Sequence, residues 1–248
     1  MSQALLEASG VSKYYGKVRA LEHIDFQINE GEVVGLLGDN GAGKSTFIKI
    51  ISGVVEPTGG ELGFEGQTVA FSSPMDARRL GIETVYQDLS LAPHLDVKQN
   101  IFLGREILKK GILGKLGFLD RKEMGNRASE MLQSFRATVS SVNQRVDELS
   151  GGQRQSVAIM RAASWGSKLI ILDEPTAALG VEQSQQVLDL IKDLKKRHLA
   201  VIFITHTMPF AFEVCDRLVV LRLGKVAADL KTGETSINEV VQYITGSK

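Results

Sequence analysis

The sequence predicts an α/β fold built around a mainly parallel sheet, because short apolar runs alternate with helical patterns. Three runs, within Glu32–Gly38, Leu169–Leu172 and Ala200–Ile204, are almost wholly apolar, as expected for strands that helices cover on both faces. Between the last two runs lies an apolar stripe at helix spacing, formed by Val187, Leu190, Ile191 and Leu194. Strands joined by such crossover helices form a doubly wound α/β core.

Composition narrows the classes of function. The chain has 248 residues, of which 43% are hydrophobic, so it can bury a sizeable core. Its 29 basic and 29 acidic residues give zero formal net charge, which argues against a partner made of nucleic acid. The lone Cys215 excludes an internal disulfide and leaves too few thiolates for a structural zinc site, so a reducing compartment is the simplest interpretation.

No targeting or membrane-spanning segment is expected. Residues Met1–Glu7 lack the basic start and the apolar stretch of a secretory signal. Nowhere do about 18 apolar residues follow one another, as a membrane-spanning helix requires. We therefore expect a protein that is soluble by itself, and a peripheral subunit if it serves a membrane process.

The remaining patterns divide a single domain, residues 1–248, into a core and an insertion. Strand patterns at Leu5–Ala8 and Ala20–Ile28 open the core. Leu218–Leu223 and Lys225–Leu230 close it as a hairpin, followed by a short C-terminal helix. We assign residues 1–88 and 151–248 to the core and about 89–150 to a helical subdomain.

The insertion is expected to be mostly helical. Asp96 predicts the cap of a helix through Asn100–Gly104. Asp120 and Glu123 have the spacing of a capping box. The helix that they predict carries one apolar face, made of Met124, Ala128, Met131, Leu132 and Phe135. The lysine- and glycine-rich stretch Lys109–Gly117 is expected to be a loop between these two helices.

A phosphate-binding loop follows the first buried strand. Residues 38–45 fit the pattern G-x-x-x-x-G-K-[ST] at every fixed position, and strand, loop and helix occur in the required order. The glycines let backbone N–H groups surround phosphates, and the following helix directs its positive end at the same charge. We expect nucleotide binding by Gly38, Asp39, Asn40, Gly41, Ala42, Gly43, Lys44, Ser45 and Thr46, with Lys44 on the β- and γ-phosphates and Ser45 on Mg²⁺.

Two acidic residues at the end of a later buried strand supply the chemistry of hydrolysis. Asp173 directly follows Leu169–Leu172, so its carboxylate is placed to hold the metal through water. Glu174 is one residue further on and is placed to polarise the attacking water as general base. Together with the glycine loop, this pair defines a P-loop NTPase.

A third motif, Leu149–Gln153, narrows the class further. Ser150 and Gln153 have capping-box spacing, so they predict a helix start. A capped helix start that contains Gly151 and Gly152 is also an open anion site. Both interpretations hold together, and a helix start so distant in sequence from Gly38 need not face its own nucleotide.

These motifs, in this order and over nearly the whole length, resemble those of ABC-type ATPase domains. The resemblance implies a P-loop NTPase core with a mainly parallel sheet, an N-terminal antiparallel β subdomain and a helical insertion subdomain. It also implies that the signature of one subunit, Ser150, Gly151, Gly152 and Gln153, closes on the ATP held by a second ATPase subunit, in a head-to-tail dimer formed with a copy or a paired homologue.

Further roles come from the same resemblance. Tyr15 matches the aromatic residue that stacks on adenine, and Gln87 matches the glutamine that senses the metal and the attacking water. His206 matches the histidine that contacts the γ-phosphate, so the catalytic set is Glu174, His206 and Lys44. Ser45, Gln87 and Asp173 form the expected metal set. The family usually has aspartate where this chain has Gly180, in the loop that links the two ATP sites.

The resemblance extends to partners and location. The short sequence Ala177–Val181 is similar to the corresponding sequence in ATP-binding subunits of simple-sugar importers. It implies an integral membrane permease as partner, a solute-binding protein acting indirectly, and a peripheral position on the cytoplasmic side of the membrane. Three alternatives stay open: an importer of another small solute, a soluble ABC ATPase acting on ribosomes or DNA, and a non-catalytic regulatory subunit. The intact Glu174 and signature disfavour the last.

Overall fold

The computed structural model describes residues 4–135 and 137–248. Part of the N-terminal segment used above to argue against a secretory signal, Met1 to Gln3, lies outside the described residues. By its internal contacts the chain divides into two compact units. Unit 1 comprises the described part of Met1–Gln87, then Gly166–Pro175 and Ile191–Lys248, and unit 2 comprises Asp88–Trp165 and Thr176–Leu190. Each unit is described by itself.

A six-stranded, mainly parallel sheet runs through the described part of unit 1 in the order β10-β9-β3-β8-β7-β6. β3 pairs in parallel with β8 and β9, and β7 pairs in parallel with β6 and β8. Only β10 is antiparallel within this sheet. The strands are β3 (Val33–Leu37), β6 (Ile82–Val85), β7 (Leu169–Asp173), β8 (Ala200–Ile204), β9 (Arg217–Arg222) and β10 (Lys225–Lys231). The predicted α/β fold with a parallel sheet is confirmed.

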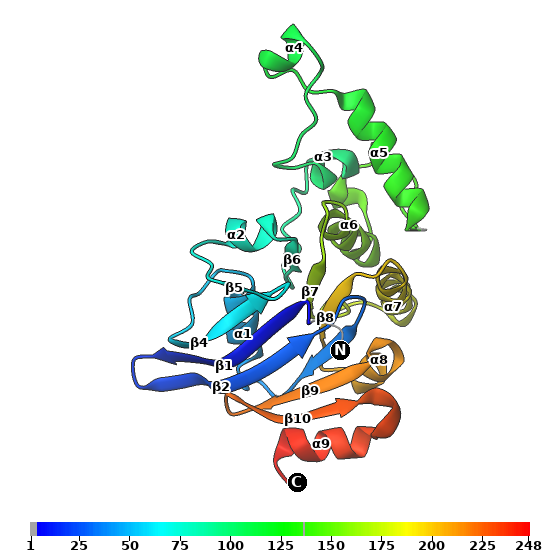
Figure 1. Ribbon diagram of the computed structural model, residues 1–248. Helices are drawn as coiled ribbons and strands as arrows, with labels where there is room; N and C mark the ends of the chain where they lie inside the picture. The colour runs from blue at the N-terminus through cyan, green and yellow to red at the C-terminus, as the bar shows by residue number, and fades with distance from the viewer. Residues whose placement is uncertain (1–3, 136) are drawn as a thin grey trace. The chain divides into compact units, whose positions relative to one another are not determined.

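A second, antiparallel sheet in unit 1 has the order β2-β1-β4-β5. Its strands are β1 (Leu6–Tyr15), β2 (Val18–Ile28), β4 (Gly59–Phe64) and β5 (Gln67–Val69). β1 is much longer than the segment that the sequence predicted, because it continues to Tyr15 through residues that do not alternate between apolar and polar. β4 and β5 were not predicted at all. This sheet is the expected antiparallel β part of the core (Figure 1).

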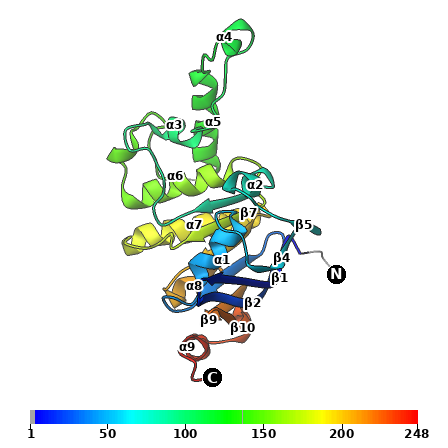
Figure 2. The same cartoon turned by 90° about the vertical axis from the view of Figure 1, so that its left-hand side faces the viewer.

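Helix α1 (Lys44–Ile51) contributes to the core of unit 1. Its Phe47, Ile48 and Ile51 are almost fully buried in one cluster with side chains of both sheets. Phe47 meets Phe26 of β2 edge to face, with ring centroids 5.2 Å apart, an arrangement that aromatic pairs favour. These contacts fix the position of helix α1, which Figure 2 labels.

The other helices of unit 1 are short. They are α2 (Pro74–Arg79), α8 (Met208–Val214), the 3₁₀ turn η2 (Thr232–Glu234) and α9 (Ile237–Thr245). α9 is the expected C-terminal helix and packs on the β9–β10 hairpin. Helix α7 (Val181–Lys196) begins in unit 2 and ends in unit 1, and its predicted stripe of Val187, Leu190, Ile191 and Leu194 is buried.

Unit 2 is helical. Its elements are α3 (Val97–Ile101), α4 (Ile112–Lys115), α5 (Arg121–Ser134), the 3₁₀ turn η1 (Val146–Glu148), α6 (Gly151–Ala163) and the first part of α7. Asp96 caps α3 as predicted, in a full capping box with Gln99. On α5 the prediction is half right: the Asp120 carboxylate accepts from the Glu123 N–H, but the Glu123 side chain pairs with Arg127 at 2.7 Å.

Two further expectations for unit 2 are modified. The apolar face of α5 buries Met124, Ala128 and Leu132, whereas Met131 is only half-buried. The stretch Lys109–Gly117, expected to be a loop, contains the one-turn helix α4. No helix among the described residues is both long and apolar enough to span a membrane.

Candidate active site

The loop between β3 and α1 has a shape that only glycine permits at two positions. Gly38 has φ +146°, and a Cβ there would lie 2.3 Å from the Leu221 carbonyl oxygen of β9. Gly43 has φ +109°, and its Cβ would lie 2.6 Å from a methyl group of Leu21. Both glycines have positive φ and a close neighbour, Leu221 of β9 for Gly38 and Leu21 of β2 for Gly43. The loop is therefore packed between a strand of each sheet, with no room for a side chain at these positions.

The helix start that follows this loop is open to an anion. Gly43 is the N-cap of α1, and no side chain of the described residues caps it. The first N–H groups of any helix lack partners inside the helix, and the helix dipole adds positive potential at the same end. Ser45 is exposed and Thr46 half-buried in this first turn. The loop and helix start thus combine uncapped N–H groups with positive potential, an arrangement that suits an anion.

Lys44 lies over the loop that precedes it. Its buried ammonium donates to the Gly38 carbonyl at 2.7 Å and to the Asp39 carbonyl at 3.0 Å. Burial lowers the pKa of Lys44, while Glu174, Asp39 and Asp173 oppose this shift through their negative charges. These charges place Lys44 and the two acidic residues of the β7 end in one electrostatic cluster.

Asp173 ends β7 and is only partly accessible to solvent. Its pKa is raised, first because burial penalises the charged carboxylate and then because Glu174 is a nearby like charge. Lys44, His206 and Lys49 act in the opposite direction. Asp173 thus lies near Lys44 of the loop in surroundings that disfavour its charged form.

Glu174 is held in a strained backbone conformation. Its φ is +50°, in the left-handed region that costs a residue with a side chain about 1–3 kcal/mol. Its N–H donates to the Ile204 carbonyl of β8 at 3.1 Å. Its carboxylate oxygen lies 2.7 Å from Nε2 of His206. Neighbouring parallel strands thus bring together the proposed base and the proposed γ-phosphate contact.

The other predicted residues of unit 1 lie at or near exposed turns. Asp39, Asn40 and Gly41 are exposed in the loop, where the Asn40 N–H donates to the Asp39 carboxylate at 2.7 Å. Tyr15 is 47% exposed at the end of β1, and Lys13 lies 5.3 Å from its ring centroid. Gln87 is exposed just after β6.

The signature residues begin α6 in unit 2. Ser150 is the N-cap, its hydroxyl accepts from the Gln153 N–H at 3.3 Å, and the Gln153 side chain accepts from the Ser150 N–H at 3.0 Å. The capping box predicted from the sequence is therefore formed. Gly152 is buried against α7: a Cβ there would lie 2.9 Å from the Cβ of Gln183. Close helix packing is thus one reason for glycine at this position.

The residues present fit a magnesium ion. Mg²⁺ prefers oxygen ligands and is commonly held by one or two side chains together with substrate phosphates and water. The Ser45 hydroxyl at the start of α1 and the Asp173 carboxylate at the end of β7 are such donors. Within residues 4–135 and 137–248 no group of three or more His, Cys, Asp and Glu side chains could hold a metal by itself.

Sequence reasoning missed the contribution of the β9–β10 turn. The Gly224 N–H donates to the Ala42 carbonyl at 3.0 Å, and the Glu22 N–H donates to the Gly224 carbonyl at 2.8 Å. Gly224 has φ +78°, and a Cβ there would lie 2.9 Å from the Ala20 carbonyl oxygen. The only sequence signal was a glycine between two strand patterns, which predicts a turn. It does not predict that this turn lies against the glycine loop.

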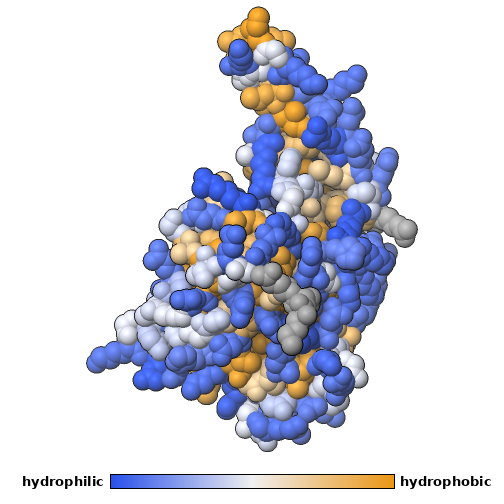
Figure 3. All heavy atoms as spheres, viewed as in Figure 1, coloured by the Kyte–Doolittle hydropathy of each residue, from blue (hydrophilic) through white to orange (hydrophobic). Residues whose placement is uncertain are grey.

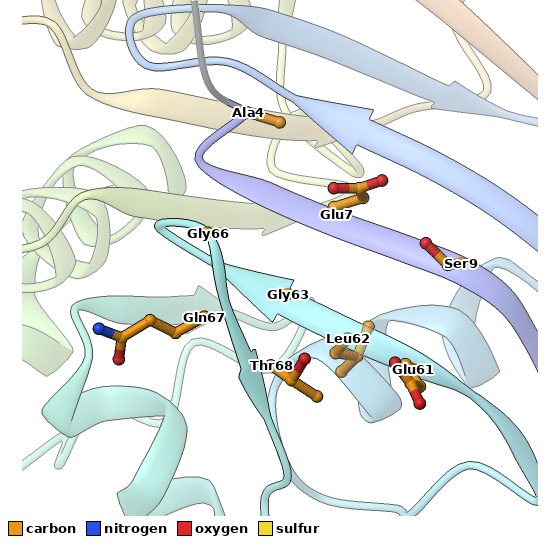
Figure 4. Close-up of a pocket in the computed structure, with 9 residues that line it drawn as sticks. All are labelled: Ala4, Glu7, Ser9, Glu61, Leu62, Gly63, Gly66, Gln67 and Thr68. Carbon is orange, nitrogen blue, oxygen red and sulfur yellow. The ribbon is translucent and has the colours of Figure 1, made fainter.

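A hollow lies on the antiparallel sheet, and Figure 4 shows the residues that line it. It measures about 240 Å³ and is lined by side chains of β1, β4 and β5, including Glu7, Glu61 and Thr68. None of the residues predicted for the site lines it. We assign it no role in nucleotide chemistry.

The fold and the loop between β3 and α1 define a P-loop nucleotide-binding protein. The chain belongs to the ABC transporter family, whose family model matches residues 21–177. Over 248 residues it is 48% identical to the fructose import ATP-binding protein FrcA of Rhizobium meliloti, covering 99% of this chain and 95% of that protein. It is also 48% identical over 241 residues to the xylose/arabinose import ATP-binding protein XylG of Sulfolobus acidocaldarius, covering 97% and 94%.

Longer relatives match over about half of their length. The ribose import ATP-binding protein RbsA of Hahella chejuensis is 36% identical over 245 residues, which cover 99% of this chain and 48% of the relative. Among solved structures, the ATP-binding cassette MJ1267 has a TM-score of 0.84 and 25% identity, covering 98% of this chain and 99% of that one. A dimeric post-hydrolysis state of the cassette MJ0796 with ADP and Pi has a TM-score of 0.75 and 28% identity, covering 92% and 98%.

Proposed function

We propose that this protein binds and hydrolyses ATP with Mg²⁺ as the ATP-binding subunit of an importer for a simple sugar. The observation that carries the enzymatic part is the cluster of Lys44, Asp173, Glu174 and His206 beside an open helix start. The sugar is supported by the relatives, which are named for the import of fructose, of xylose and arabinose, and of ribose.

Binding of ATP begins with an exchange of hydrogen bonds in this proposal. The Lys44 ammonium leaves the carbonyls of Gly38 and Asp39 and contacts the β- and γ-phosphates, where its charge is better neutralised. Ser45 and Asp173 would hold Mg²⁺, which would neutralise phosphate charge when bound. Tyr15 supplies an exposed ring on which adenine stacks.

Hydrolysis is assigned to Glu174 and His206. The Glu174 carboxylate accepts a proton from the attacking water, whose oxygen bonds to the γ-phosphorus while the bond to the β-phosphate oxygen breaks, giving ADP and phosphate. The 2.7 Å contact with His206 orients this carboxylate. The left-handed φ of Glu174 supports the role, because such strain concentrates where function requires a fixed side-chain direction.

The same proposal assigns unit 2 to the communication between subunits. The capped start of α6, with Ser150 and Gly152, completes the ATP site of a second ATPase subunit. Gln87, the last residue of the first stretch of unit 1, would contact the metal and the water. The segment after it transmits closure to a membrane permease served by a solute-binding protein. The chain then works as a peripheral subunit on the cytoplasmic face of the membrane. ATP does work here only because it binds the closed dimer better than the open one.

The test uses Glu174→Gln in the purified chain, with Glu234→Gln on the surface as control. ATP turnover of Glu174→Gln is expected to fall by about 10²–10⁴ while ATP binding persists. Light scattering should then show a dimer with MgATP and a monomer without it, and Ser150→Arg should abolish that dimer. Unchanged turnover would remove Glu174 as the base. A monomer that has nonetheless bound ATP would refute closure between two copies of this chain.

A further inference from the structure

The segment that connects α3 to α5 contains a compact, largely apolar stretch, residues 107–119, which we call the apolar tip. Two backbone hydrogen bonds close its neck, from the Lys109 N–H to the Phe118 carbonyl at 2.8 Å and from the Asp120 N–H to the Ile107 carbonyl at 2.7 Å. α4 forms its far end, as Figure 1 shows. Gly114 has no room for a side chain, since a Cβ would lie 1.8 Å from the Lys109 carbonyl oxygen. The tip is therefore a folded feature.

Large apolar side chains cover this tip on the outside. Ile112 is 78% exposed, Leu116 68% and Phe118 55%, and Leu108, Leu113 and Leu119 are exposed as well. Figure 3 shows the apolar colour concentrated at this end of unit 2. Single exposed apolar residues are ordinary on a protein surface, but a contiguous group of this size marks a place where something binds.

The charges of the tip are all positive. Lys109, Lys110 and Lys115 are exposed, and residues 107–119 contain no Asp or Glu. Across the described ranges, no carboxylate forms an ion pair with any of these three lysines. A convex surface that combines bulky apolar groups with unopposed lysines complements an anionic lipid surface, where the apolar groups enter the interface and the lysines meet phosphates.

We propose that the apolar tip inserts into the surface of an anionic lipid bilayer, so that the chain itself binds the membrane weakly. A protein partner would be expected to match the tip with directional polar groups around its apolar centre. The tip instead offers lysines, whose long stems suit lipid phosphates at variable positions. The inference goes beyond the proposed function, because it concerns contact with lipid and involves neither ATP nor a permease.

The experiment is sedimentation of the full chain with vesicles, without nucleotide. Vesicles of phosphatidylcholine alone are compared with vesicles in which one third is phosphatidylglycerol. Binding to the anionic vesicles is expected to exceed binding to the neutral ones and to weaken as salt is raised, because each lysine contributes about fivefold in partition near an anionic surface. The triple variant Ile112→Ser, Leu116→Ser, Phe118→Ser should lose at least about tenfold in partition.

Matched controls separate the tip from general surface properties. Leu223→Ser removes an exposed apolar residue of unit 1, and the triple variant Lys196→Gln, Lys231→Gln, Lys248→Gln removes equal charge there. Both should bind vesicles as the parent chain does, whereas Lys109→Gln, Lys110→Gln, Lys115→Gln should not. No sedimentation with anionic vesicles, or equal binding by the serine variant, overturns the proposal. If no chain sediments with vesicles and the serine variant fails to bind a co-expressed permease that the parent chain binds, the tip is a protein-binding site instead. ATP turnover, measured separately, tests only the proposed function.

Discussion

At the residue scale, the site in unit 1 holds its charged groups in places that disfavour them. Burial lowers the pKa of Lys44 and raises that of Asp173, and Glu174 adopts a left-handed backbone. Each of these features costs folding free energy. Residues kept under such conditions are candidates for function, because proteins commonly trade stability for activity at their sites.

The Asp173 carboxyl gives a prediction with a defined sign. Since folding raises its pKa above the ordinary 3.8, the folded state binds its proton more tightly than the unfolded state does. The free energy of unfolding therefore falls as pH rises from about 3.8 through the folded pKa, and the loss persists at neutral pH. We expect Asp173→Asn to stabilise the protein at pH 7, by less than about 1 kcal/mol because the group still meets solvent.

Urea denaturation at pH 7 measures this change, with Asp193→Asn as control at a half-buried position of α7 whose carboxylate pairs with Lys196 at 2.8 Å. The control should shift the free energy of unfolding by less than about 0.5 kcal/mol in either direction. ATP turnover of Asp173→Asn should fall sharply, since the neutral amide lacks the negative charge with which a carboxylate attracts Mg²⁺. A variant that is less stable than the parent at neutral pH would show that Asp173 is a net stabilising ion-pair partner of Lys44.

At the scale of single elements, the start of α6 serves two purposes. Ser150 and Gln153 satisfy its first N–H groups in a capping box, and Gly152 lets the helix approach α7 closely. The proposed contact with the phosphates of a partner subunit uses the same residues. Loss of activity after a change at Ser150 is therefore ambiguous unless the cap is preserved.

Two substitutions at Ser150 separate capping from phosphate contact. Ser150→Ala should lower the free energy of unfolding of unit 2 by about 1 kcal/mol and also impair turnover. Ser150→Asp keeps a good N-cap, so stability should return, but its carboxylate would repel phosphate and turnover should stay low. Thermal melts and steady-state ATPase assays measure both properties. Full turnover in the aspartate variant would leave Ser150 with a capping role alone.

The β9–β10 turn is a second element with a testable role. Gly224→Ala places a Cβ against the Ala20 carbonyl at a left-handed φ, so it should destabilise unit 1 by roughly 1–3 kcal/mol and weaken ATP binding through the displaced Ala42 carbonyl. Gly166→Ala is the matched control, because its φ is also positive but its Cβ meets nothing within 4 Å. Equal ATP affinity of the two variants, measured by calorimetry, would mean that the turn does not shape the loop.

At the scale of the whole molecule, nucleotide should stabilise the folded state. A ligand at about a hundred times its dissociation constant adds about 2.7 kcal/mol, which corresponds to roughly 5–10 °C in the unfolding midpoint for a unit of this size. We expect this shift with MgATP in differential scanning fluorimetry, and its loss in Lys44→Ala. An undiminished shift in that variant would place the nucleotide elsewhere.

The fold was predictable wherever sequence pattern and burial coincide. The buried strands β3, β7 and β8 are continuous apolar runs, and the stripe of α7 follows helix spacing. β4 and β6 were missed, because β4 begins with two glycines and β6 has only four residues, one of them the buried Glu83. Strand identity there comes from pairing with distant partners rather than from local propensity.

The candidate site was predictable to a different degree. Local motifs located the glycine loop and the Asp173–Glu174 pair, since phosphate binding and hydrolysis need those residue types at fixed spacing. They did not reveal that Leu221 and Gly224 pack against the loop. Nor did they reveal that Lys13 lies over the Tyr15 ring. The contacts of Leu221 and Gly224 join segments far apart in the chain, so no local pattern encodes them. The contact of Lys13 with Tyr15 is local, but it depends on side-chain conformation, which a residue pattern does not give.

The backbone hydrogen bond from Gly224 to Ala42 has a consequence for folding during synthesis of the protein. The ribosome makes the glycine loop long before it makes the turn that contacts the Ala42 carbonyl and the Leu221 carbonyl that abuts Gly38. Nascent chains that stop before this hairpin carry the whole glycine motif without the contacts that shape it. We therefore expect nascent chains to retain nucleotide only after the β9–β10 hairpin has been made.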